Sequence, residues 1–140
     1  LSVYLDDRTC LVTSHGIFHN VNVENSLALL KTGIAHHGKP HAVMTDHGVT
    51  YYNNTPDHKG LLKLNGYQIA LQTMGIKHYL ARINRPQTNG KVERFFLTYK
   101  TEYATGSFND INDYIEHYNT QRPHMSLLNK TPKEVWNDLC

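Results

Sequence analysis

Two acidic residues stand at positions where a carboxylate can do chemistry. Asp46 follows the apolar run 42–44 after one residue, Thr45, and is therefore predicted at the carboxyl end of a short buried strand. Glu93 lies just after the Asn89-Gly90 pair, where a helical pattern begins. Functional groups of open α/β sheets collect beyond the carboxyl ends of parallel strands. A strand-end Asp and a first-turn Glu can bind one hard cation through carboxylate oxygens.

Each acid also has a plainer explanation. The segment 85–93 contains Pro86, which restrains the chain, and Asn89-Gly90, which tolerates the positive φ of a tight bend. An acid in the next helical turn complements the helix dipole. Asp46 alone is equally well explained as a turn-capping acid. The pairing of the two acids is what favours a metal site.

A local excess of positive charge surrounds Glu93. Between residues 77 and 100 there is one acid, Glu93, and six basic residues: Lys77, Arg82, Arg85, Lys91, Arg94 and Lys100. Such a stripe is the electrostatic footprint of phosphate binding. Taken alone, it fits a solvated helix face with its loop equally well.

Composition limits the remaining possibilities. The 140 residues are 39% hydrophobic and 19% charged, which is typical of one globular domain. No apolar run has the length of a membrane span and no signal peptide opens the chain, so no membrane partner is expected. Cys10 and Cys140 show no metal-ligand spacing, which favours a reducing intracellular compartment. The ten histidines do not repeat at ligand spacing, so a structural zinc site is not expected.

The hydrophobic pattern predicts an alternation of strands and helices. Strands are expected at 1–5, 10–19, 42–44 and 76–81, and helices at about 22–37, 61–74, 90–104, 108–118 and from Thr131 onward. The first two strands form a hairpin, and the helix before residue 42 indicates a parallel crossover. A polar segment at 49–60 is expected to be an irregular loop. The predicted fold class is α/β with a mixed sheet flanked by helices.

Local signals refine three of the helices. Gly66 weakens the middle of the helix at 61–74. The helix at 90–104 is expected to bury Val92, Phe95, Phe96 and Tyr99, and the helix at 108–118 to bury Ile111, Tyr114, Ile115 and Tyr118. Thr131, Pro132 and Glu134 have the spacing of an N-cap, an N1 proline and a capping box.

Three ordered motifs resemble one family. The run Met44-Thr45-Asp46-His47-Gly48 and the run 86–94 are similar to the second and third catalytic motifs of retroviral-integrase-like DDE transposases. The run 118–124, followed by Leu127 and Thr131-Pro132, resembles the tail of insertion-sequence transposases of that superfamily. Residues 3–8 and 38–40 also fit. The resemblance covers nearly the whole chain.

The resemblance implies a ribonuclease-H-like fold that depends on Mg²⁺ or Mn²⁺ and nicks and joins DNA strands. Such sites commonly hold two metal ions about 3.5–4 Å apart. Asp46 would be the second acid of the catalytic and metal-binding triad, and Glu93 the third. DNA contacts would come from these residues: Arg85, Asn89, Lys91, Arg94 and Lys100. Lys100 lies seven positions after Glu93 and thus shares its helix face.

The sequence departs from the family pattern in two places. The first acid of the triad belongs to a strand that precedes residues 1–5, so we expect residues 1–140 to be an N-terminally truncated core whose C-terminal helical tail begins at about residue 106. Asp6 and Asp7 match a later acid pair, and Asp6 as a substitute ligand is the less favoured alternative. The interval between Asp46 and Glu93, 46 residues, exceeds the usual retroviral spacing, and the excess falls in the irregular loop.

The leading hypothesis is the catalytic core of a DNA transposase or integrase, a two-metal polynucleotidyl transferase. The first alternative is an inactive truncated core that only binds DNA or self-associates, and the second is a ribonuclease-H-like nuclease acting on RNA–DNA hybrids. Expected partners are DNA, both element ends and target, and further copies of the chain in a homodimer or larger assembly. The expected location is the cytoplasm or nucleoid of a prokaryotic-type cell. Arg122-Pro123-His124 is predicted to be structural, because Pro ends the preceding helix.

Overall fold

A computed structural model describes residues 1–53, 55–81 and 89–139. The chain forms two compact units. The first comprises Leu1–Tyr4 and Ser14–Asn89, and the second comprises Leu5–Thr13 and Gly90–Cys140.

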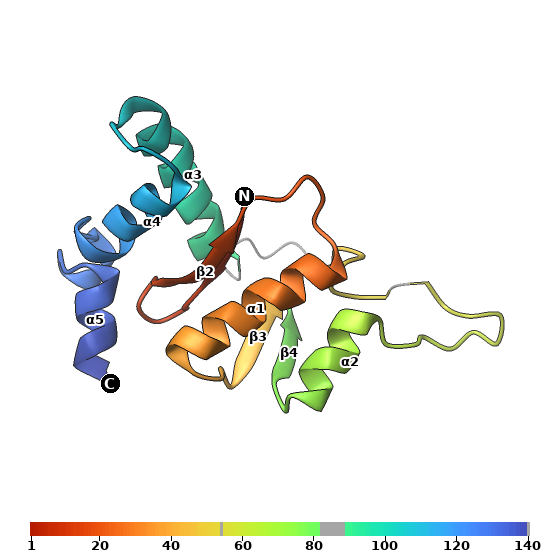
Figure 1. Ribbon diagram of the computed structural model, residues 1–140. Coiled ribbons are helices and arrows are strands. Elements are labelled where there is room, and N and C mark those ends of the chain that lie inside the picture. Colours follow the sequence, from red (N-terminus) through yellow and green to blue (C-terminus); the bar gives the residue numbers. More distant parts are fainter. Residues whose placement is uncertain (54, 82–88, 140) are drawn as a thin grey trace. The chain divides into compact units, whose positions relative to one another are not determined.

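The order of elements agrees with the predicted alternation (Figure 1). The strands are β1 (Ser2–Leu5), β2 (Val12–Gly16), β3 (Ala42–Thr45) and β4 (Lys77–Leu80). The helices are α1 (Val23–His37), α2 (Gly66–Thr73), α3 (Gly90–Thr105), α4 (Ile111–Thr120), the short 3₁₀ helix η2 (Met125–Leu127) and α5 (Pro132–Leu139). None of the helices in the described ranges is both long enough and apolar enough to cross a bilayer.

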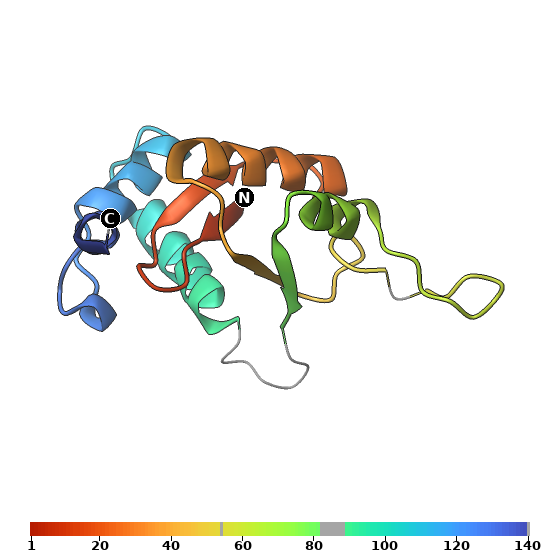
Figure 2. The ribbon, with the colours of Figure 1, turned by 90° about the horizontal axis from the view of Figure 1, so that it is seen from below.

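The first unit is built on the parallel pair β3–β4, in which Ala42 is opposite Lys77 and Thr45 is opposite Leu80. The helix α2 packs against both α1 and β4, and Figure 2 shows both helices on one side of the strand pair. The core cluster between these elements consists of Leu30, Val43, Tyr67, Leu71 and Ile76. The packing of this core and the pairing with β4 hold the carboxyl end of β3 in place.

Local chemistry explains the limits of α1. The Asn22 side chain accepts a hydrogen bond from Asn25 N at 2.8 Å and caps the first turn. Gly38, with φ of 90°, ends the helix in a conformation that side chains disfavour. The predicted helix at 22–37 is therefore confirmed.

The prediction for α2 was wrong at its N-terminus. The helix begins at Gly66, because Asn65 and Gln68 form a reciprocal capping box there. Leu61, Leu62 and Leu64, which were expected on a helix, lie in a loop and are exposed. Gly66 is the first helical residue and does not interrupt the helix.

The predicted single mixed sheet is not found among the described residues. They form two two-stranded sheets, β1–β2 and β3–β4. A parallel crossover exists, but it joins β3 to β4 through α2, one connection later than predicted. The class is nevertheless mixed α/β. Residues 49–53 and 55–60 contain no strand or helix, in agreement with the predicted irregular loop.

An aromatic core holds the second unit together. Phe95 of α3 is 1% exposed and meets Tyr118 of α4 edge to face, with ring centroids 5.0 Å apart. Tyr114 is fully buried. The predicted buried face of α3 is confirmed for Phe95 only, since Val92, Phe96 and Tyr99 are half-buried.

The C-terminal helices follow their capping signals. Asp110 caps α4 through Asp113 N at 2.9 Å, so the helix begins at Ile111, later than predicted. Thr131 and Glu134 form the predicted capping box: Thr131 N donates to the Glu134 carboxylate at 2.7 Å, and Glu134 N donates to Thr131 Oγ1 at 3.2 Å.

Candidate active site

Asp46 lies directly after β3 with its side chain exposed. Its Oδ1 accepts a hydrogen bond from Gly48 N at 2.8 Å. A Cβ atom on residue 48 would lie only 2.9 Å from that oxygen, so glycine permits this tight turn. The carboxylate is thus oriented by the backbone while remaining accessible to solvent.

A hydrogen-bond chain fixes the backbone of Asp46. Thr45 Oγ1 donates to the Asp46 carbonyl at 3.0 Å, and His78 Nε2 lies 2.7 Å from the same Oγ1. Because the threonine proton is already donated, His78 Nε2 is the donor in the second bond. Burial lowers the pKa of His78, which favours the neutral ring. The chain therefore runs from His78 through Thr45 to Asp46.

His47 also stabilises the turn that follows β3, through a hydrogen bond of its side chain. Its Nε2 lies 2.9 Å from the Ala81 carbonyl, which can only accept, so Nε2 is the donor. The His47 ring also meets Tyr52 edge to face at 5.6 Å. Sequence reasoning did not single out His78 or Thr45 as supports of the site. Thr45 directly follows one predicted strand and His78 lies on another, but the parallel register that brings them together was not predictable from the sequence.

Glu93 lies in the first turn of α3 with an exposed side chain. Its neighbours Lys91 and Arg94 are also exposed, as is Lys100 two turns later. In the part of the chain that the structure describes, no ion pair involves Glu93. The buried Phe95 anchors this end of the helix, so the acidic and basic side chains are held outward.

Lys91 is engaged by the loop between β1 and β2. Its Nζ lies 3.0 Å from Asp7 Oδ1 and also donates to the Asp7 carbonyl. The Asp7 side chain is 95% exposed. Lys91, which is predicted to contact DNA phosphate, therefore forms an ion pair with Asp7 in the free chain.

Asp6 has a structural task in that loop. Its Oδ2 accepts hydrogen bonds from Thr9 N at 2.8 Å and from Thr9 Oγ1 at 2.7 Å. Asp6 N donates to the Leu11 carbonyl at 2.8 Å, and Thr9 is fully buried. These bonds account for Asp6 without a metal.

The candidate residues are divided between the two units. Asp46 and Asn89 belong to the first unit, and Lys91, Glu93, Arg94 and Lys100 belong to the second. Arg85 lies outside the described residues. Among the described residues, no three His, Cys, Asp or Glu side chains converge as a metal-binding group.

The chemistry of the two acids nevertheless suits a hard divalent cation. Carboxylate oxygens are the ligands that Mg²⁺ prefers, usually one or two of them together with water and substrate phosphate. Asp46 and Glu93 both present exposed carboxylates at the ends of anchored elements. Each acid is thus fit to contribute ligand oxygens.

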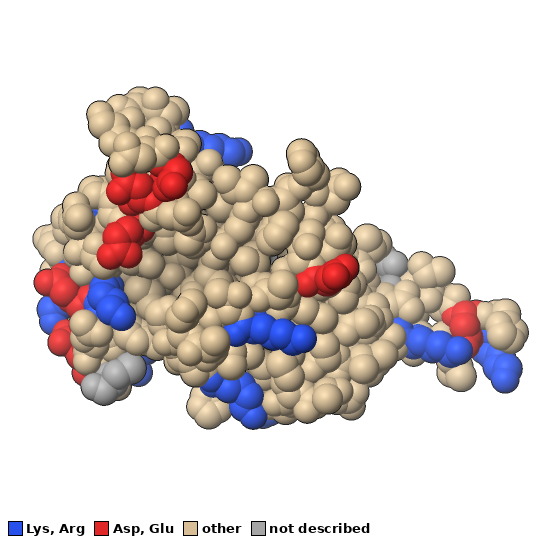
Figure 3. All heavy atoms as spheres, in the orientation of Figure 1, with Lys and Arg blue, Asp and Glu red and all other residues tan. Residues whose placement is uncertain are grey.

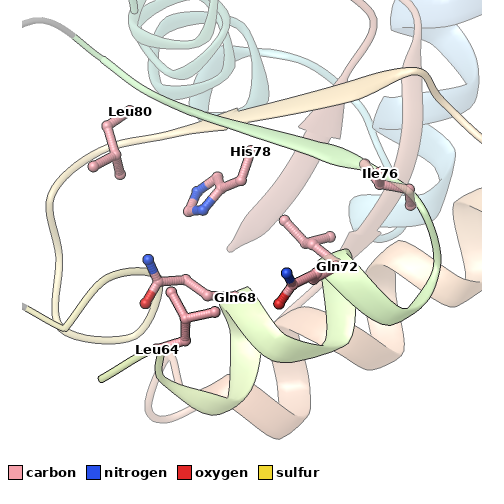
Figure 4. Close-up of a pocket in the computed structure, with 7 residues that line it drawn as sticks. Leu64, Gln68, Gln72, Ile76, His78 and Leu80 are labelled. Carbon is pink, nitrogen blue, oxygen red and sulfur yellow. The ribbon is translucent and has the colours of Figure 1, made fainter. Parts of the chain in front are cut away.

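A hollow of about 270 Å³ lies between α2 and β4 (Figure 4). Its lining is mostly apolar and contains no carboxylate: Leu64, Gln68, Leu71, Gln72, Ile76, His78 and Leu80. It therefore adds no third carboxylate to the candidate site.

Comparison with known proteins identifies the relationship. Residues 74–132, which include Glu93 and all of α3 and α4, match the integrase core domain family. Residues 74–132 thus resemble an integrase core domain. The resemblance predicted from the catalytic motifs is confirmed.

Two further comparisons cover nearly the whole chain. A putative integrase ORF3 of Spiroplasma virus SpV1-C74 is 27% identical over 150 residues, covering 97% of this chain and 41% of the viral protein. A chain of the simian T-cell lymphotropic virus intasome, solved in complex with PP2A regulatory subunit B56 gamma, superposes with a TM-score of 0.70 at 21% identity. That match covers 96% of this chain and 46% of the other. This chain thus spans less than half the length of each of these two proteins.

Proposed function

We propose that this chain is the catalytic core of a DNA integrase or transposase with a ribonuclease-H-like fold. The observation that carries the proposal is the position of Glu93. It is exposed between two cations at the start of an anchored helix, within the segment that matches the integrase core domain. Asp46, exposed after a parallel strand, supplies the second acid.

In this proposal Asp46 and Glu93 hold Mg²⁺ or Mn²⁺. When bound, such ions neutralise phosphate charge and activate the attacking oxygen in phosphodiester cleavage and transfer. The chain itself contributes orientation: His78 and Thr45 hold the Asp46 turn, and Phe95 holds the start of α3. No covalent protein intermediate is required, because positioning supplies much of the rate acceleration.

The cations near Glu93 are assigned to the DNA backbone. Lys91, Arg94 and Lys100 present exposed positive charges on α3, and Asn89 precedes the helix. Arg85 is assigned to the same role from the sequence alone. Each phosphate contact strengthens binding and makes it salt-dependent. A DNA duplex and further copies of the chain are the proposed partners.

The family resemblance implies a third acid beside Asp46 and Glu93. Asp6 is a weak candidate for it, because its carboxylate already closes the loop on Thr9.

Cleavage of a pre-nicked or branched DNA in Mn²⁺ tests the proposal. Wild-type chain should cut this substrate, and Asp46→Asn and Glu93→Gln should each abolish cutting while preserving the fold. Glu24→Gln is the matched control, because Glu24 is also a first-turn acid with an exposed side chain. Metal-independent binding without cutting would support the binding-only core. Preferential cutting of an RNA–DNA hybrid would support a ribonuclease-H-like nuclease.

A further inference from the structure

The loop between the Asp46 turn and α2 has no part in the candidate active site. It carries three exposed leucines within four positions: Leu61, Leu62 and Leu64, at 63%, 54% and 48% exposure. Single exposed leucines are ordinary on a protein surface. A local concentration of them is typical of an interaction site.

Hydrogen bonds fix the base of this loop beside the Asp46 turn. Asn65 Nδ2 donates to the Thr50 carbonyl at 2.9 Å. Asn53 Nδ2 donates to the Lys63 carbonyl at 2.8 Å, which closes the loop a second time. Because Thr50 is four positions after Asp46, the loop leaves and rejoins its unit close to the candidate acid.

A second set of bonds shapes the end of the loop, residues 57–63, which we name the loop tip. Asp57 Oδ1 accepts hydrogen bonds from Lys59 N and Leu61 N, both at 2.9 Å. Asp57 N donates to the Leu61 carbonyl at 2.9 Å, and Gly60 N donates to the Asp57 carbonyl at 2.9 Å. Gly60 has a φ of 76°, which glycine adopts without steric cost. The loop tip is therefore a preformed turn.

Local structure accounts for Leu64 but not for the other two leucines. Leu64 lines the hollow between α2 and β4. Leu61 and Leu62 belong neither to that lining nor to the core cluster of the first unit. The turn at the loop tip uses only the backbone of Leu61, so a polar side chain would serve it equally well. The side chains of Leu61 and Leu62 are thus available to a partner.

Positive charge accompanies the exposed leucines. In Figures 1 and 2 the yellow-green loop extends away from α1 and α2, the helices of its own unit. Figure 3 shows basic side chains on two sides of an acidic one at the end of this loop. The loop tip contains Lys59 and Lys63 against the single acid Asp57, and both lysines are exposed. In the described part of the chain, no ion pair involves either lysine.

The composition of the loop tip favours nucleic acid over protein as its partner. Protein interfaces are depleted in Lys and enriched in aromatic residues, whereas residues 55–64 contain two lysines and no Phe, Tyr or Trp. Proteins that bend DNA insert apolar side chains such as Leu between base steps from the minor groove. Lysines beside such a wedge can bind the backbone phosphates. Leu61 and Leu62 lie between two lysines in this way.

We propose that the loop tip is a DNA wedge, in which Leu61 and Leu62 enter the minor groove and separate two stacked base pairs. Lys59 and Lys63 bind the flanking phosphates. The inference rests on the proposed function in taking DNA as the partner. A wedge kinks the duplex at the step that it opens. Pyrimidine–purine steps such as TA open easily and A-tracts are stiff, so the loop tip selects flexible steps without hydrogen bonds to the bases.

The fluorescence of 2-aminopurine, which rises when this base is unstacked, tests the wedge directly. A duplex with 2-aminopurine at a TA step should brighten when the wild-type chain binds, and the same probe in an A-tract should brighten less. Leu61→Ala/Leu62→Ala should lose at least about half of the gain and the preference for the TA duplex. Ile17→Ala/Ile69→Ala is the matched control, since these side chains are 65% and 52% exposed in the same unit. The control should keep both.

Salt dependence of duplex binding tests the two lysines. Lys59→Gln/Lys63→Gln should reduce the slope of log K against log salt by about two if each lysine contacts one phosphate. Lys31→Gln/Lys77→Gln is the matched control, because both lysines are exposed and belong to the same unit. It should change the slope by less than about one.

The wedge fails if the wild-type chain gives no fluorescence gain, or if both apolar variants lose the gain equally. It also fails if Leu61→Ala/Leu62→Ala keeps the gain but changes the sedimentation of the chain, since the loop tip would then contact another copy. The fluorescence assay contains no metal. Wild-type cutting in Mn²⁺ without a gain would therefore overturn the wedge and leave the proposed function standing, and a gain without cutting would do the reverse.

Discussion

The ammonium of Lys91 lies 3.0 Å from Oδ1 of Asp7, although 83 residues separate the two in the sequence. The loop between β1 and β2 therefore places a carboxylate on the cation that begins α3. Lys91 is assigned to DNA phosphate, and a lysine ammonium that is shared with a carboxylate has a competing partner. The Asp7–Lys91 pair opposes the DNA contact in the free chain.

Removing the Asp7 charge should strengthen DNA binding. Exposed ion pairs are worth about 0–1 kcal/mol, so Asp7→Asn should raise duplex affinity about two- to fivefold at low salt. Lys91→Gln should lower it. Fluorescence anisotropy with a labelled duplex measures both effects. Asp138→Asn is the control, because Asp138 also forms an exposed ion pair, with Lys130 at 2.7 Å. If Asp138→Asn raised DNA affinity as much as Asp7→Asn, the effect of Asp7 on Lys91 would not be local.

Breaking the chain from His78 to Asp46 should disturb both stability and cutting. Thr45→Val keeps the shape of the side chain but leaves the His78 donor without its acceptor, which costs about 1–3 kcal/mol. Denaturant unfolding should show this loss, and Mn²⁺-dependent cutting should fall more than duplex binding. Thr32→Val is the control, since Thr32 Oγ1 bonds only the exposed Ala28 carbonyl of its own helix at 3.0 Å. Equal effects of the two variants would argue against a role for Thr45 at the site.

The capping box of α5 gives a stability prediction that is independent of function. Thr131→Ala should lower the free energy of unfolding by about 1 kcal/mol, because Glu134 N loses its side-chain acceptor. Thr131→Ser should restore most of it. Thermal unfolding followed by circular dichroism checks the pair, and identical midpoints for both variants would show that the hydroxyl does not matter.

Acid should destabilise the second unit through His124. This residue is 8% exposed, and burial together with Arg122 lowers its pKa below the usual value near 6.5. The unfolded state then binds a proton more readily than the folded state, so stability is complete above about pH 6.5 and is lost as pH falls toward the folded-state pKa. His124→Gln should make the difference in unfolding free energy between pH 7.5 and pH 5.5 smaller than in the wild type. His58→Gln, which changes an exposed loop histidine, should leave it as in the wild type.

Signals that act over a few residues were readable in the sequence. The predicted range 22–37 agrees with the Asn22 cap and the Gly38 end of α1, and Thr131 with Glu134 begins α5 as predicted, because a cap depends on side chains three or four positions apart. The α2 prediction failed where two such signals competed. The apolar residues from Leu61 extended the helical pattern, but the reciprocal bonds of Asn65 and Gln68 set the actual start.

Contacts between distant segments were not readable. The parallel register that pairs Thr45 with Leu80 depends on how α2 packs, and the bond between Thr45 and His78 follows from that register. The Asp7–Lys91 pair likewise depends on packing between a hairpin loop and a helix. The positions of Asp46 and Glu93 within their own elements were predictable because each follows a local strand or turn signal.

The division of the hairpin between the two units has a practical consequence. The chain passes from one unit to the other after Tyr4, after Thr13 and after Asn89. One proteolytic cut at any of these points leaves two covalent connections, so a single nick cannot release either unit. Expressing residues 1–89 and 90–140 as separate halves would deprive the C-terminal half of residues 5–13, including the buried Thr9 and Leu11. Reconstitution from such halves would require the hairpin loop of one fragment to complete the fold of the other.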